Sequence, residues 1–116
     1  MAIIEREPRA SRAAPPSLDQ IRPGLAAFCA GHGITRAIVF GSYARGTQTR
    51  RSDLDLVIVM DTAKRFLDRY DEVKDIHDLV PDVHVEMLIY TEDELRAIEH
   101  RPFVRQILRE GVVVHE

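Results

Sequence analysis

Two aspartates in the middle of the chain have the spacing of a metal site. Asp53 and Asp55 are separated by one residue and lead into the apolar residues 56–60, a pattern that predicts a buried β-strand. Side chains alternate between the two faces of a strand, so both carboxylates project from one face, about 6.5 to 7 Å apart. Proteins bind Mg²⁺ through one or two carboxylates together with substrate phosphate oxygens and water. The pair therefore indicates a site for a divalent cation.

A small polar turn precedes this pair. Gly41 and Ser42 follow the predicted strand 36–40, and ten residues separate Ser42 from Asp53. Glycine lets a phosphate approach backbone N–H groups closely, and the serine hydroxyl can donate a further hydrogen bond. Arg45 lies in the same turn and is a candidate for neutralising phosphate charge. We interpret Arg50 and Arg51, farther along the loop, as solvated charges. The turn thus predicts a phosphate site beside the metal site.

A third carboxylate is expected from a later strand. Glu86 lies within residues 83–90, where apolar and polar residues alternate as in a half-buried strand. It shares a face with Asp82 and His84; we interpret Asp82 as a turn residue after a proline, and His84 as a hydrogen-bonded strand histidine. Three acids on one face repel unless cations are present. An enzyme that clamps a triphosphate with two divalent ions needs such a cluster, since catalysis of phosphoryl transfer depends mostly on positioning and charge neutralisation.

The elements that position these residues follow from hydrophobic periodicity and capping signals. Ser17 is expected to cap a short helix and Pro23 to open a second one. Residues 62–80 have the three- and four-residue intervals of an amphipathic helix. Thr91 with Glu94 forms a capping-box pattern for another helix. The predicted order is helix, strand, strand, helix, strand, two helices and strand, with strands at 36–40, 53–60, 83–90 and 112–114, and the last helix running from Pro102 to Gly111.

Length and composition suit a single globular domain. The chain has 116 residues, a net charge of −3 and one cysteine, Cys29, so we expect no internal disulfide, no broad nucleic-acid surface and a cytoplasmic location. No apolar run approaches the about 20 residues of a membrane span. Residues 1–16 carry mixed charges and three prolines and are predicted to be a flexible N-terminal tail, followed by one domain at 17–116. At this size the domain has no room for its own acceptor module, so a large acceptor is expected on another molecule.

These motifs resemble those of a known family. The segment GSYARGTQTRRSDLDL is similar to the Gly-Ser, ten-residue gap, Asp-x-Asp signature of the DNA polymerase β-like nucleotidyltransferase superfamily. Together with VEMLIYT, TEDEL and LREGVVV, it resembles the minimal nucleotidyltransferases, from about Gly24 to the C-terminus. The resemblance implies an α+β, two-layer palm-like domain, a short mixed sheet with helices packed on it.

The resemblance also implies roles for the site residues. Asp53, Asp55 and Glu86 would bind two Mg²⁺ ions, and Gly41 with Ser42 would hold the phosphates of the nucleoside triphosphate substrate. The chain departs from the family at one position, because Glu86 stands where aspartate is usual. Glutamate has one more methylene, so its reach differs, although it can still serve as ligand or base.

The family further implies a biological setting. Minimal nucleotidyltransferases are typically encoded beside a HEPN-domain ribonuclease toxin, and they transfer AMP from ATP to a tyrosine of that toxin. We therefore expect an Mg²⁺-dependent nucleotidyltransferase that is the antitoxin of such a pair. Two alternatives stay open: a non-catalytic antitoxin that binds and occludes the toxin, and a metal-dependent nuclease, which would leave the Gly41–Ser42 turn unexplained.

Overall fold

A four-stranded mixed sheet forms the centre of the protein. The computed structural model describes residues 14–116, so most of the predicted tail, including Arg6, Arg9 and Arg12, lies outside the described residues. The strands are β1 (Ile34–Phe40), β2 (Leu54–Met60), β3 (Val85–Tyr90) and β4 (Val112–His115). They lie in the order β3-β2-β1-β4, with β1 antiparallel to both neighbours and β2 parallel to β3. The predicted α+β class and mixed sheet are confirmed.

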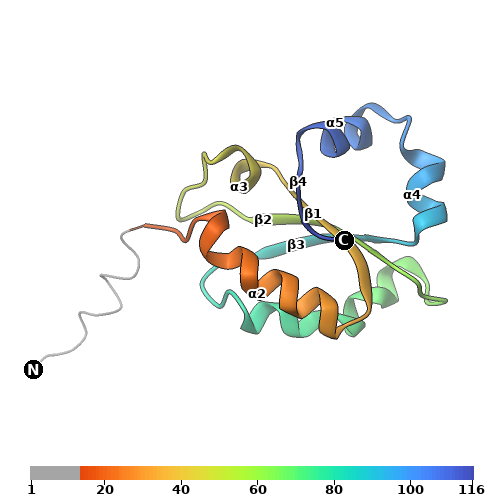
Figure 1. The fold of residues 1–116 in the computed structure, drawn as a ribbon, viewed down its shortest axis with the longest axis horizontal. Helices are drawn as coiled ribbons and strands as arrows, with labels where there is room; N and C mark the ends of the chain where they lie inside the picture. Colours follow the sequence, from red (N-terminus) through yellow and green to blue (C-terminus); the bar gives the residue numbers. More distant parts are fainter. Residues whose placement is uncertain (1–13) are drawn as a thin grey trace, which may run out of the picture.

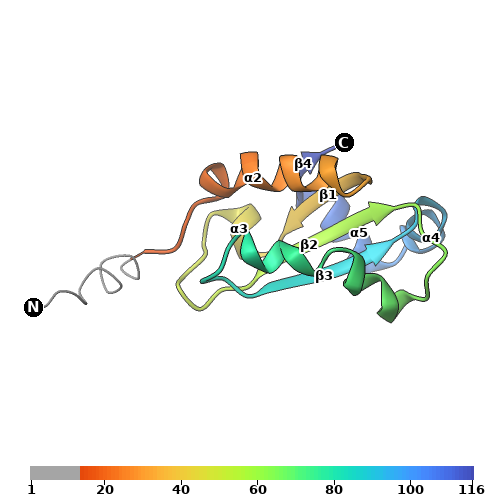
Figure 2. The ribbon, with the colours of Figure 1, turned by 90° about the horizontal axis from the view of Figure 1, so that it is seen from below.

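Helices cover both faces of this sheet (Figures 1 and 2). On one face α2 (Leu18–Gly31) and the 3₁₀ segments η2 (Phe66–Glu72) and η3 (Lys74–Asp78) pack on the larger hydrophobic cluster. On the other face α4 (Glu92–Ile98) and α5 (Pro102–Glu110) enclose a smaller cluster. Where two layers were expected, α4 and α5 therefore add a third, thinner one. Within residues 14–116 no helix has both the length and the apolar content to cross a membrane.

The N-terminal helix differs from the prediction. Ser17 does cap it, with a capping box formed by Gln20, but α2 runs through Pro23 as one helix. Pro23 has no N–H for the carbonyl of Asp19, four residues earlier. Both residues are exposed, so water can satisfy that carbonyl. The predicted break at Pro23 was wrong because Ile21 and Leu25, on either side of it, are both buried against the sheet.

The connection between β2 and β3 also differs from the prediction. Residues 62–80 were expected to form an α-helix, but they form η2 and η3, with an irregular start and end. A 3₁₀ helix rises about 2.0 Å per residue, against about 1.5 Å in an α-helix. The same residues therefore reach farther along the sheet, as the connection between two parallel strands requires. Buried Arg69 holds η2 in place by donating hydrogen bonds to the carbonyl oxygens of Lys64 and Ile89.

Candidate active site

The Gly41 turn joins the end of β1 to a short helix, α3 (Ser42–Arg45). Gly41 has φ 75° and ψ −150°, a conformation that essentially only glycine adopts. A Cβ at this position would overlap Oδ2 of Asp55, so glycine is required both by the backbone and by the neighbouring carboxylate. The carbonyl of Gly41 accepts hydrogen bonds from the N–H groups of Ala44 and Arg45, each at 3.1 Å. The N–H groups of Ser42 and Tyr43 precede these bonds in the first turn of α3, where helical N–H groups have no intrahelical acceptor.

The three predicted acids meet on one face of the sheet. Asp55 pairs in register with Glu86 across the parallel strands β2 and β3, and with Phe40 on β1. Asp53 lies just before β2, two residues from Asp55. The pKa of Asp55 is raised, first by burial and then by the negative charges of Asp53 and Glu86, while Arg45 acts in the opposite direction. The acids are thus close enough to repel one another, and Arg45 is close enough to act on Asp55.

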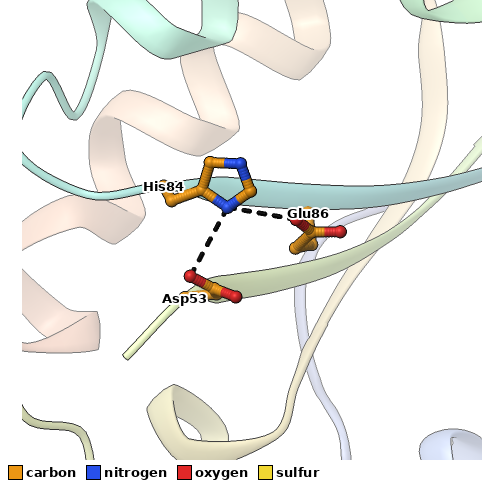
Figure 3. A group of neighbouring side chains, drawn as sticks. All are labelled: Asp53, His84 and Glu86. Carbon is orange, nitrogen blue, oxygen red and sulfur yellow. Dashed lines mark ion pairs between the residues drawn. The ribbon is translucent and has the colours of Figure 1, made fainter. Parts of the chain in front are cut away.

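His84 joins this group, although the sequence pattern led us to expect an ordinary strand histidine. Its Nδ1 lies 3.1 Å from Oε2 of Glu86 and 3.4 Å from Oδ1 of Asp53, and Figure 3 shows the ring standing between the two carboxylates. The ligand atoms of all three residues lie within 4.8 Å of one another. The sequence contained one indication that His84 belongs to the site: it stands two residues before Glu86, so both side chains project from one face of the strand. Asp82 lies apart, in the turn before β3, beside a hollow that Tyr43 also lines.

A cleft opens between the Gly41 turn and α5. Its volume is about 200 Å³, and it is lined by β1, α3, β2 and α5 through these residues: Phe40, Gly41, Ala44, Arg45, Asp55, Phe103, Gln106, Ile107 and Glu110. Phe103 is 58% exposed and meets Phe40 edge to face. The sequence predicted the helix that begins at Pro102 but not its contribution to this site. The cleft places an apolar wall beside Asp55 and Arg45.

Two further residues belong to the larger hydrophobic cluster. Tyr43, in α3, is buried, at 2% exposure. Cys29 is buried in α2, and burial raises the pKa of its thiol to about 11. Neither side chain takes part in the acidic cluster.

Comparison with known proteins supplies independent information. The sequence pattern of the family described as "Nucleotidyltransferase domain" matches residues 22–115. A Methanocaldococcus jannaschii protein named "Putative protein adenylyltransferase" is 35% identical over 52 residues, which are 45% of this chain and 56% of that protein. The match thus spans little more than half of that relative's length.

Solved structures with the same fold extend the comparison. One described as a "putative minimal nucleotidyltransferase" is 28% identical, with a TM-score of 0.59 over 97% of this chain and 98% of its own. A crystal structure of a toxin–antitoxin with AMP-PNP has a TM-score of 0.58 at 20% identity, covering 80% of this chain and 71% of its own. At that identity the second likeness concerns the fold alone.

Proposed function

Because the chain belongs to the nucleotidyltransferase domain family, we propose that it transfers AMP from ATP to a hydroxyl group of a partner protein, in an Mg²⁺-dependent reaction. The observation that carries the proposal is the contact between Gly41 and Asp55. It brings the backbone of the turn directly against a carboxylate of the acidic cluster, because a Cβ at position 41 would overlap Asp55. A phosphate on the turn and a cation on the acids would then be neighbours.

The donor set suits Mg²⁺. Asp53, Asp55 and Glu86 are carboxylates, the oxygen ligands that Mg²⁺ prefers. Burial, and next repulsion by the charges of Asp53 and Glu86, raise the pKa of Asp55. A bound cation relieves that repulsion. These three residues would hold two ions, which would neutralise the phosphate oxygens and lower the pKa of the attacking hydroxyl.

The chain's own residues position the nucleotide. Ser42 and the N–H groups of the first turn of α3 would donate hydrogen bonds to the β- and γ-phosphates, and Arg45 would pair with phosphate charge. The cleft of about 200 Å³ is smaller than the about 300 Å³ of the smallest usual ligand pockets. A nucleotide bound there would therefore extend beyond the cleft.

The reaction balances without a further reagent. The acceptor hydroxyl oxygen forms a bond to the α-phosphorus, and the bond from that phosphorus to the α,β-bridging oxygen breaks. Pyrophosphate departs, and the hydroxyl proton passes to Glu86 or to water. The carboxylate side chain of Glu86 is 56% exposed, so an acceptor from outside can reach it.

The proposed partner is a HEPN-domain ribonuclease toxin, and the proposed role is that of its antitoxin. Support comes from the relative named "Putative protein adenylyltransferase". Occlusion of the toxin without transfer is the second candidate. The exposed side chains of Leu67 and Phe103 offer apolar contact area for a docked protein, which both candidates require.

Labelled ATP distinguishes these candidates. The protein is incubated with Mg²⁺, ATP labelled on the α-phosphate and the product of the adjacent gene, and mass spectrometry then locates the label. We expect AMP on the partner with the wild type and with Asp61→Asn, a control at the opposite end of β2, and none with Asp53→Asn/Asp55→Asn. Toxin silencing without label, equal in the double variant, would select occlusion; neither label nor silencing would reject both.

A further inference from the structure

His84 occupies a position from which it can contribute a nitrogen atom to the cation site. It lies directly before β3, and its ring stands between the carboxylates of Asp53 and Glu86 (Figure 3). Nδ1 faces both carboxylates, at 3.1 Å from Glu86 and 3.4 Å from Asp53. The side chain is 63% exposed, so packing does not hold it there.

The spacing of these atoms matches that of ligands around one metal ion. Metal–nitrogen and metal–oxygen bonds of about 2.0 to 2.2 Å place two ligands about 3.0 Å apart at a right angle and about 3.4 Å apart at the tetrahedral angle. The two Nδ1–oxygen distances, 3.1 and 3.4 Å, fall at these values. The set can therefore accept a cation with little movement, since all ligand atoms already lie within 4.8 Å of one another.

We propose that His84 is a nitrogen ligand in a site with Asp53 and Glu86, and that this site takes Mn²⁺, Co²⁺ or Zn²⁺ with an affinity that an all-carboxylate site would not reach. Imidazole favours transition metals, whereas Mg²⁺ favours oxygen ligands. The inference rests on the proposed function in that Asp53 and Glu86 are the carboxylates assigned there. Its test needs neither ATP nor an acceptor.

Metal titration of the full chain tests the proposal. Isothermal titration calorimetry with Co²⁺, Zn²⁺ and Mg²⁺ compares the wild type with His84→Ala and with His100→Ala, a control at an exposed histidine after α4. Transition metals bind carboxylate sites more tightly than Mg²⁺ in any case, so the diagnostic quantity is the change caused by each substitution. We expect His84→Ala to raise the Kd for Co²⁺ and Zn²⁺ about tenfold or more, with the Kd for Mg²⁺ changed less than about threefold.

A spectroscopic measurement and a second variant complete the design. Zn²⁺ should shift the ring nitrogen resonance of His84, and not that of His100, in long-range ¹H–¹⁵N spectra. His84→Asp supplies oxygen in place of nitrogen, so it should keep Mg²⁺ binding and still bind Zn²⁺ less tightly than the wild type. Folding of the variants is checked by their melting temperatures.

The outcomes separate the two proposals. Unchanged Kd values for Co²⁺ and Zn²⁺ in His84→Ala, or an equal loss for all three metals, would overturn the nitrogen ligand. Either result leaves the proposed function intact if ATP with Mg²⁺ still raises the melting temperature of the wild type. A wild type that binds no divalent cation, with or without ATP, would reject both.

Discussion

The surroundings of Asp55 shift the pKa of its carboxyl group. Asp55 touches the Gly41 turn. Its pKa is raised, first by partial burial and then by the negative charges of Asp53 and Glu86. The folded protein therefore binds a proton at Asp55 more readily than the unfolded chain does. The free energy of unfolding accordingly falls as pH rises from the ordinary value of 3.8 through the raised pKa of the folded state.

Asp55→Asn should remove this pH-dependent cost. Without divalent cations we expect the variant to be more stable than the wild type at pH 7, seen as a higher melting temperature. The gain should shrink as the pH falls towards 4, because the folded wild type binds a proton at Asp55 more readily than the unfolded chain does. Melting curves in EDTA from pH 4 to 8 measure the difference, and the same variant should lose the stabilisation by ATP and Mg²⁺. A variant less stable than the wild type at pH 7 contradicts the expectation.

Periodicity predicted which residues share a face, but it could not reveal their neighbours. The two-residue alternation placed Asp53 with Asp55, and Glu86 with His84. The parallel register of β2 and β3, which aligns Asp55 with Glu86, depends on pairing between strands that are distant in the chain. The place of His84 between two carboxylates follows from that pairing, and for this reason it was missed.

The turn between β1 and α3 requires glycine at position 41. Gly41→Ala forces a side chain into a backbone conformation that costs about 1–3 kcal/mol and into contact with Asp55. We expect a loss of stability of at least that size and a loss of Mg²⁺–ATP binding, measured by urea unfolding and by thermal shift.

Gly31→Ala is the matched control. Gly31 lies in the last turn of α2, and a Cβ there would have no heavy atom within 4 Å apart from its chain neighbours and the backbone of its own helix. Alanine is favoured over glycine in helices by up to about 1 kcal/mol, so this variant should be as stable as the wild type or more so. Equal losses in both glycine variants would refute the special role of the turn.

The Arg69–Glu94 ion pair joins η2 to α4. The two side chains form a bidentate pair at 2.5 and 2.9 Å, and Arg69 is only 4% exposed. The hydrogen bond from Arg69, and next that from the N–H of Thr91, lower the pKa of Glu94 from 4.5 to about 2. The stabilisation is therefore complete above pH 4.5 and is lost as the pH falls from about 4.5 to about 2.

Glu94→Gln isolates the charge, because glutamine can keep the capping box with Thr91. We expect a cost of about 1–2 kcal/mol at pH 7, below the about 3–5 kcal/mol of a fully buried pair, since the Glu94 side chain is 45% exposed and solvent screens it. Asp93→Asn, at a neighbouring acid that is 94% exposed, should change stability by less than about 0.5 kcal/mol. Urea unfolding at pH 7 and pH 3 should show the difference between Glu94→Gln and the wild type shrinking at low pH.

The type of an element was predicted correctly where the sequence has a capping signal or a strand alternation. It was predicted wrongly where contacts with distant parts of the chain determine the backbone conformation. Thr91 and Pro102 correctly predicted where α4 and α5 begin. The 3₁₀ form of η2 was not predicted, and within this segment Arg69 donates a hydrogen bond to the distant carbonyl of Ile89. Local periodicity contains no information about that contact.

At the scale of the whole molecule, the sheet divides the protein into two hydrophobic clusters with different relations to the site. The larger cluster lies beneath α2, η2 and η3 and includes Ile76. The smaller one lies beneath α4 and α5 and includes Ile107, which also lines the cleft. Stability should depend on both clusters, whereas the position of the α5 wall of the cleft should depend on the smaller one.

Ile107→Ala and Ile76→Ala test this division. Both side chains are buried, at 4% and 1% exposure, so each substitution should cost about 2–5 kcal/mol in urea unfolding. Only Ile107→Ala lets α5 move relative to Asp55 and the Gly41 turn. We therefore expect it to weaken ATP binding about tenfold, measured by calorimetry with Mg²⁺ below the melting temperature, while Ile76→Ala binds ATP as the wild type does. If both variants weakened binding equally, the clusters would be acting as one core, and α5 would have no separate part in shaping the nucleotide site.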